Sequence, residues 1–269
     1  IIYDKSYSGH HTEYINHIAN FIVQNEIQDK YLFVVHENIL DSIPILNKCN
    51  TLIVKKDRIQ LWNYLNPIKK AFEEFKYLTE ITIDYNITTI FFLNIDPYQH
   101  LIGTKLFKSN LWQVRGIWFH PYFRVCSTSI GLKTRFKVFT KKIRKKIQLR
   151  WMLRNNNIDS IFILNDKQAV EYYCENYKSV FKYLPDPISP LHKNKIKSSD
   201  TINQIYSETE KEKRYVFLLF GSLNNRKNVL NIIKAFSLLN PTIAQKVSLF
   251  ILGKCKDSKY EKEILYEID

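Results

Sequence analysis

The 269-residue chain has little of several residue types, and each shortage excludes a class of protein. Six glycines are too few for a collagen-like or glycine-linker sequence. The four cysteines are scattered singly, so they predict neither a zinc site nor a disulfide framework and are interpreted as reduced thiols. No apolar run approaches the roughly 20 residues that a membrane-spanning helix needs.

Acidic residues are also missing from one long interval. Between Asp96 and Asp159 there is no Asp or Glu, whereas the same interval contains 14 Lys and Arg residues. The rest of the chain has 26 basic and 26 acidic residues, so the whole net charge of +14 comes from this segment. A charge concentrated in this way predicts an anionic partner rather than a generally basic protein.

Short apolar runs alternate with helical patterns along the chain. Strands are predicted at 1–4, 31–35, 51–54, 89–94, 113–119, 160–164 and 180–184. Helices are predicted between them, at 12–27, 60–80, 133–155 and 166–177. Fully apolar strands that alternate with helices are typical of βαβ units, so an α/β fold with a parallel sheet is expected.

The pattern breaks at Leu184-Pro185-Asp186-Pro187, and a polar stretch follows. We therefore expect an N-terminal Rossmann-like domain over 1–184 and a linker over 185–214. A new strand, helix and strand over 215–269 predict a second Rossmann-like domain. About 55 residues are too few to complete such a domain, which usually needs 100 or more. The chain also starts inside a strand and without Met, so it is interpreted as a fragment.

Two polar motifs follow predicted strands. Ser8-Gly9-His10-His11 lies where the first strand gives way to the first helix. Gly9 would let the backbone approach a ligand, and the histidines could donate hydrogen bonds to phosphate or sugar hydroxyls. Alternatively, Gly9 makes a tight turn and the histidines cap the helix.

His120 stands at the carboxyl end of the predicted strand 113–119 and precedes Pro121. A histidine there could act as an acid, a base or an electrostatic stabiliser, or it could simply be satisfied by the backbone. Tyr122 and Arg124 lie within reach of the same rim. Asp96 follows the strand 89–94 in the same way; it could bind hydroxyls, although capping of the next helix is favoured.

The stretch 217–239 reads as strand, glycine turn, cationic loop and helix. The apolar run ends at Gly221, and Arg226 and Lys227 stand side by side in the loop. A helix start preceded by two cations suits a phosphate. A plain βα unit with a solvated basic loop would give the same pattern.

Residues 133–154 form a basic amphipathic pattern. Apolar residues recur every three or four positions, at Phe136, Phe139, Ile143, Ile147 and Trp151, and lysines mostly occupy the other faces. This stripe is expected to pack on the sheet. The basic faces then predict either a solvated surface or contact with an anionic membrane.

Most of the chain resembles the nucleotide-sugar glycosyltransferases of the GT-B fold, family 4-like. The resemblance is strongest at 6–14, where a GGHHxEY-like loop occurs, at 160–187 and at 216–239. In the last stretch, Phe220-Gly221 is followed by Arg226-Lys227 and then by a helix with the pattern AF..L. The resemblance implies a GT-B protein whose second domain is incomplete, and whose two domains face a cleft.

The resemblance also implies roles for individual residues. Arg226 and Lys227 would hold the diphosphate of a nucleoside-diphosphate sugar, with the Gly9–His10 loop near the phosphates and His120 facing the reacting sugar. Transfer would be retaining and metal-independent, without a cofactor, in agreement with the lack of a DxD pair. A glycan or lipid-linked acceptor in cell-surface polysaccharide synthesis is implied, with the protein cytoplasmic and peripheral on the inner face of the cell membrane.

Two alternatives differ in class from an enzyme. A truncated, inactive relative would only dock on an anionic membrane or a partner. A nucleic-acid-binding protein would use the basic patch over 105–154, but no recognised module is present and the aromatic residues lie on the apolar stripe. Nucleic acid is therefore not expected as a partner.

Overall fold

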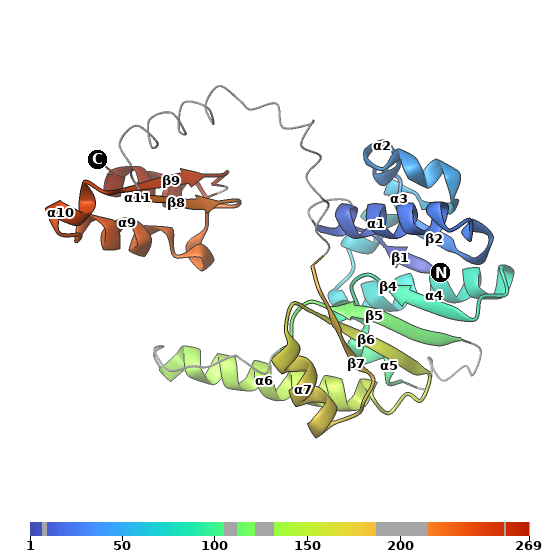
Figure 1. Ribbon diagram of the computed structural model, residues 1–269. Helices are drawn as coiled ribbons and strands as arrows, with labels where there is room; N and C mark the ends of the chain where they lie inside the picture. Colours follow the sequence, from blue (N-terminus) through green and yellow to red (C-terminus); the bar gives the residue numbers. More distant parts are fainter. Residues whose placement is uncertain (7–9, 105–111, 122–131, 187–214, 256, 269) are drawn as a thin grey trace. The chain divides into compact units, whose positions relative to one another are not determined.

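The computed structural model describes residues 1–6, 10–104, 112–121, 132–186, 215–255 and 257–268 (Figure 1). The chain divides into two compact units, Ile1–Ile188 and Ser189–Asp269, and each is described by itself. Among the described residues, no helix is long and apolar enough to cross a membrane.

Unit 1 is built on a seven-stranded sheet in the order β3-β2-β1-β4-β5-β6-β7, and every pair of neighbours is parallel. The strands are β1 (Ile2–Asp4), β2 (Leu32–His36), β3 (Asn50–Val54), β4 (Thr89–Phe92), β5 (Gln113–Trp118), β6 (Ile158–Leu164) and β7 (Phe181–Leu184). The predicted α/β class with a parallel sheet is confirmed, and all seven strands lie where the apolar runs predict them.

The connections alternate between helices and short turns. The α-helices of unit 1 are α1 (His10–Gln24), α2 (Ile39–Ser42), α3 (Lys56–Asn63), α4 (Pro67–Asp84), α5 (Gln99–Ile102), α6 (Leu132–Met152) and α7 (Lys167–Asn176). In the part of unit 1 that the structure describes, the 3-10 turns η1 (Gln28–Lys30), η2 (Pro44–Lys48) and η3 (Asp96–Tyr98) accompany them. The helix predicted over 60–80 is in fact two helices, because Pro67 begins α4 and the Asn66 side chain caps it by accepting the Lys69 N–H at 3.0 Å.

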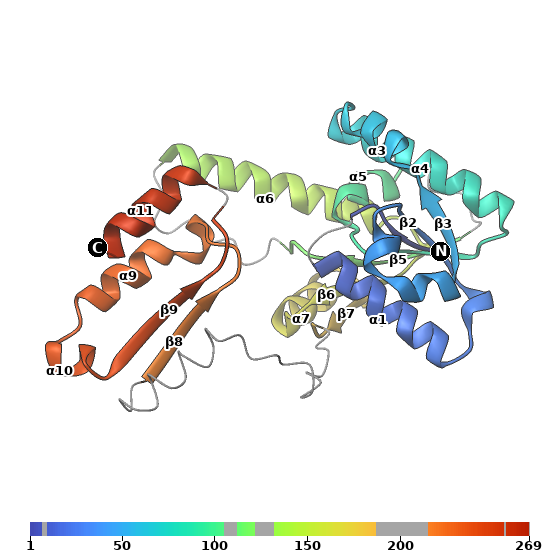
Figure 2. The ribbon, with the colours of Figure 1, turned by 90° about the horizontal axis from the view of Figure 1, so that it is seen from above.

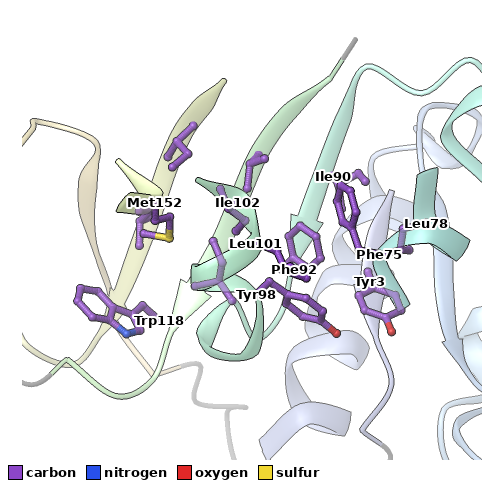
Figure 3. Close-up of a cluster of buried hydrophobic side chains, with 14 of the residues drawn as sticks. Tyr3, Phe75, Leu78, Ile90, Phe92, Tyr98, Leu101, Ile102, Trp118 and Met152 are labelled. Carbon is purple, nitrogen blue, oxygen red and sulfur yellow. The ribbon is translucent and has the colours of Figure 1, made fainter. Parts of the chain in front are cut away.

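Helices cover the two faces of the sheet unequally (Figures 1 and 2). On one face, α3, α4, α5, α6 and α7 bury a core that runs along the sheet, including Phe92, Tyr98 and Trp118 (Figure 3). On the other face, α1, α2 and η2 bury a smaller core around β1, β2 and β3. Because the strands carry apolar residues on both faces, they read as continuous apolar runs rather than as alternating ones.

The packing of α6 differs from the expectation. Its buried residues are Leu149 and Met152, and the Lys145 side chain is only 14% exposed. The stripe expected to pack on the sheet faces away from it, with exposed fractions from 42% to 69% at Phe136, Phe139, Ile143, Ile147 and Trp151. The expectation was wrong because periodicity shows that a helix has two faces but does not show which one meets the sheet.

Unit 2 contains two parallel strands, β8 (Tyr215–Phe220) and β9 (Val247–Leu252). They are connected through the turn η7 (Asn225–Lys227) and the helices α9 (Val229–Ser237) and α10 (Pro241–Ala244), and α11 (Ser258–Ile268) follows. A small core that includes Val229, Ile233 and Tyr260 joins α9 and α11 to the strands. The predicted strand, turn, helix and strand are all present.

Candidate active site

The strand order has one switch point, between β1 and β4. From β1 the chain proceeds to β2 and β3 on one side, and from β4 it proceeds to β5, β6 and β7 on the other. The connections therefore diverge at the carboxyl ends of β1 and β4. In open α/β sheets, this is where ligands bind. The side chains that leave β1, β4 and β5 at this edge are the first candidates for a functional site.

A histidine and a carboxylate pair at the end of β1. Asp4 is buried, and its Oδ1 accepts the backbone N–H of Ser6 at 2.8 Å. Its Oδ2 lies 2.6 Å from Nδ1 of His11, in the first turn of α1. This hydrogen bond to Asp4 raises the pKa of His11, although partial burial acts in the opposite direction. Asp4 thus fixes the orientation of the ring.

A second pair lies at the ends of β4 and β5. Asp96 accepts the indole N–H of Trp118 at 3.1 Å and the backbone N–H of Phe119 at 3.0 Å. Nδ1 of His120 lies 3.6 Å from Oδ2 of the same carboxylate, and the His120 side chain is 73% exposed. The Asp96 carboxylate raises the pKa of His120, against the effects of partial burial and of the cations of Lys145 and Lys141.

Asp96 was expected to cap the following helix, and this is wrong. The N-cap position of η3 is occupied by Ile95, and no side chain makes a capping hydrogen bond there. The Asp96 carboxylate instead joins two neighbouring strand ends and faces His120. Sequence alone could not show this, because the partners of Asp96 come from β5, more than twenty residues away.

Phe119 brings the two pairs together. Its backbone N–H is held by Asp96, and its ring lies 5.7 Å, between centroids, from the ring of His11. Tyr14 packs against the same phenyl ring, with centroids 6.1 Å apart. Phe119 therefore contacts the His11 ring with its side chain and, with its backbone N–H, the carboxylate that faces His120. Such an arrangement can donate or accept protons, or stabilise developing charge.

Two further charged residues lie at this edge. Lys5 follows β1, and its ammonium contacts both oxygens of Glu74 on α4, at 2.5 and 2.7 Å. Glu74 has no exposed surface, and it also accepts the hydroxyl of Tyr98. This pair was not predicted from the sequence. Its only signal was an acidic residue on the apolar face of α4, between the buried residues Ala71 and Leu78.

The outcome for the residues predicted in unit 1 is uneven. Gly9, Tyr122 and Arg124 lie outside the described residues. His10 begins α1, but its side chain is outside the described part of the chain. His120 lies at the carboxyl end of β5, as predicted, and the neighbouring His11 is the histidine that the structure places in a defined contact with Asp4.

In unit 2, the glycine turn has a specific geometry. Gly221 has φ of +99°, and a Cβ atom there would lie 2.9 Å from Nζ of Lys227. The Lys227 ammonium donates to the carbonyl oxygen of Phe220 and lies 5.5 Å from the centroid of its ring. Asn224 accepts the Lys227 backbone N–H at 3.3 Å, and Asn228, with φ of +58°, directly precedes α9. Arg226 is in η7, and its side chain is outside the described part.

The turn thus places Lys227 directly beside Gly221, at the carboxyl end of β8. This is a suitable position for a cation that meets a phosphate above a glycine turn. The cleft in which Lys227 would meet His120 stays a prediction, since the two residues belong to different units.

No protein-family model matches the chain, and no curated protein sequence matches it. Among solved structures, it is similar to an α/β-galactoside α-2,3-sialyltransferase from the luminous marine bacterium Photobacterium phosphoreum. The TM-score is 0.44 and the sequence identity 12%, over 99% of this chain and 78% of that chain. At that TM-score the likeness carries no argument, so the α/β class rests on the parallel strand order and the candidate site on its own contacts.

Proposed function

We propose that the chain is part of a GT-B glycosyltransferase, which transfers a sugar from a nucleoside-diphosphate sugar to a glycan or lipid-linked acceptor in cell-surface polysaccharide synthesis. The observation that carries this proposal is the pairing of His11 with Asp4 and of His120 with Asp96 around Phe119, at the switch point of a parallel sheet. The Gly221–Lys227 turn supports it from the second unit.

In this proposal, unit 1 binds the acceptor and unit 2 binds the donor. His120 faces the anomeric centre, and Asp96 behind it holds the imidazole and favours its charged form. The exposed ring is accessible to a substrate, whereas Asp96 is mostly covered. The pair therefore acts as an oriented hydrogen-bond donor that stabilises charge on the reacting groups.

The leaving diphosphate is neutralised by Lys227 together with Arg226, and the backbone around Gly9 and His10 approaches the phosphates. Neither a metal ion nor an organic cofactor takes part, and the configuration of the transferred sugar is retained. Lys227 is well placed for this role because its ammonium already lies against the glycine turn.

The same proposal places the protein in the cytoplasm, at the inner face of the cell membrane. The exposed apolar stripe of α6 would enter the interface between headgroups and acyl chains. Arg144 and Arg150 are exposed on the same helix and would meet anionic headgroups. This differs from docking through a basic face alone, because the apolar residues themselves contact the lipid.

The test is a screen of nucleoside-diphosphate sugars by the shift in melting temperature, followed by an assay for release of the nucleoside diphosphate. We expect one donor to stabilise the protein and to be turned over. His120→Ala should reduce turnover about 10²- to 10³-fold, the usual effect of removing one donor that stabilises developing charge. The matched control is His17→Asn, which also removes an imidazole, but from the apolar side of α1. Normal turnover by His120→Ala, or the absence of any donor that is turned over, would refute the proposal.

A further inference from the structure

A small cavity lies between α6 and α7, against the end of β5. Its volume is about 80 Å³, and its lining includes Trp118, Lys142, Lys145, Lys146, Tyr172 and Tyr173. The three lysines, together with Leu149, are spaced at i, i+3, i+4 and i+7, so they share one face of α6. This is the face opposite the exposed apolar stripe.

The charge of the lining is of one sign. Three lysines are present, and no acidic side chain is among those lining residues that the structure describes. The sequence explains this, because no Asp or Glu occurs between Asp96 and Asp159. Lys145 is mostly buried, whereas Lys142 and Lys146 are exposed at the rim, so an anion that enters the cavity would be attracted by cations on one side of it.

The walls limit what the cavity can hold. Trp118 and Tyr173 pack with tilted rings whose centroids are 4.9 Å apart, and Tyr172 packs edge-on against Tyr173 at 5.2 Å. On the measure in which one water molecule needs about 10–15 Å³, the cavity has room for several. A group as small as phosphate therefore fits there. The tyrosine hydroxyls could add hydrogen bonds to the oxygens of such a group.

The cavity adjoins the candidate active site. Trp118 lines it and also donates its indole N–H to Asp96. Lys145 lines it as well, and its Nζ lies 4.0 Å from Oδ1 of Asp96. Trp118 and Lys145 would therefore lie between a group bound in the cavity and Asp96, the carboxylate that faces His120.

We propose that this cavity binds a phosphate group of the acceptor, so that the acceptor is a phosphorylated molecule and is positioned with a hydroxyl toward His120. The substrate class rests on the proposed function, whereas the phosphate site itself does not. Lys142 and Lys146 bind the phosphate from one side, and Lys145 links the site to Asp96.

The test is a titration of the full chain with inorganic phosphate, by calorimetry, at constant ionic strength maintained with chloride. We expect the double variant Lys142→Gln, Lys146→Gln to bind phosphate at least 10-fold more weakly than the wild type. The double variant Lys48→Gln, Lys69→Gln loses the same charge at exposed positions elsewhere and should bind like the wild type. Lys227→Ala removes the candidate phosphate contact of unit 2. This variant should still bind phosphate in the cavity of unit 1.

Equal affinity in the cavity variant and the wild type would overturn the proposal. So would acetate that binds as tightly as phosphate, since a carboxylate would then satisfy the site. Melting curves of both double variants verify that they are folded. If no nucleoside-diphosphate sugar is turned over, the proposed function fails, but the phosphate titration still decides the cavity.

Discussion

Oδ2 of Asp4 lies 2.6 Å from Nδ1 of His11, so a buried carboxylate at the end of β1 is joined to the first turn of α1. Because this bond raises the pKa of His11, the charged form of the histidine stabilises the fold. The stabilisation is complete below the unfolded pKa of about 6.5, and it is lost as the pH rises through the folded pKa.

We therefore expect His11→Asn to lower the free energy of unfolding most at mildly acidic pH. The loss should be about 1.5–3 kcal/mol near pH 6, the size of a hydrogen bond to a charged group, and it should shrink toward pH 9. Urea denaturation of the wild type and the variant across this range provides the measurement. A difference that stays constant, or that grows as the pH rises, would contradict the assignment.

Glu74 is fully buried and depends on Lys5 and Tyr98 for its contacts. Lys5→Met should leave this carboxylate without its cation and cost about 3–5 kcal/mol, because an unpaired buried charge is strongly destabilising. Lys5→Met combined with Glu74→Leu removes both charges, and it should be more stable than Lys5→Met alone. If the double variant were the less stable of the two, the pair would not be the source of the loss.

Under the proposed function, Lys227→Ala should reduce turnover roughly 10²- to 10³-fold, the usual effect of removing one donor that stabilises a leaving group. Lys234→Ala is the matched control, because Lys234 is exposed on α9 and pairs with Glu267 at 3.6 Å. Steady-state kinetics with the identified donor compares the three proteins. If Lys227→Ala had the same turnover as the wild type, Lys227 would not bind the diphosphate.

Gly221→Ala tests the same turn without removing a charge. The φ of +99° disfavours any residue with a Cβ, and the new methyl group would lie 2.9 Å from Nζ of Lys227. We expect a loss of about 1–3 kcal/mol in stability, together with reduced turnover as the ammonium moves. Thermal denaturation and kinetics measure the two effects; unchanged stability would mean that the turn readily adopts another conformation.

The exposed stripe on α6 should bind vesicles that contain anionic lipid. Phe139→Ser with Ile147→Ser should weaken this binding without destabilising the fold, because both side chains are exposed. Arg144→Glu with Arg150→Glu should weaken it as well, and only this second effect should depend on salt. Co-sedimentation with anionic and neutral vesicles provides the measurement. Binding that neither pair alters would leave the stripe without a role at the membrane.

Much of the fold could be predicted from the sequence, because apolar runs in a parallel sheet are short and bounded by polar turns. The runs Leu32–Val35 in β2 and Ile161–Leu164 in β6 are clear examples, since they are apolar on both faces. The short helices α2 and α5 were not predicted, since four residues are too few to show a helical period. The burial of the Lys145 side chain was not predicted either, because its partner Asp96 is distant in the sequence.

The candidate site could be predicted only in part, and for a related reason. The position of His120 follows from the end of an apolar strand. The contacts of His11 with Asp4, and of Asp96 with Trp118, depend on which strands are neighbours. That information lies in the strand order, which no local pattern specifies. The cavity lined by Lys142 and Lys146 likewise exists only once α6 and α7 are packed together.

The anchoring of Asp96 by Trp118 and Phe119 has a consequence for engineering this scaffold. A designer who exchanges the loop after β4 for one from another protein also removes the acceptor for two groups of β5. The segments that follow these two strands therefore form a single module, and a chimera that transplants one without the other should be inactive even when it folds. Libraries aimed at a new specificity are best built by varying both segments together.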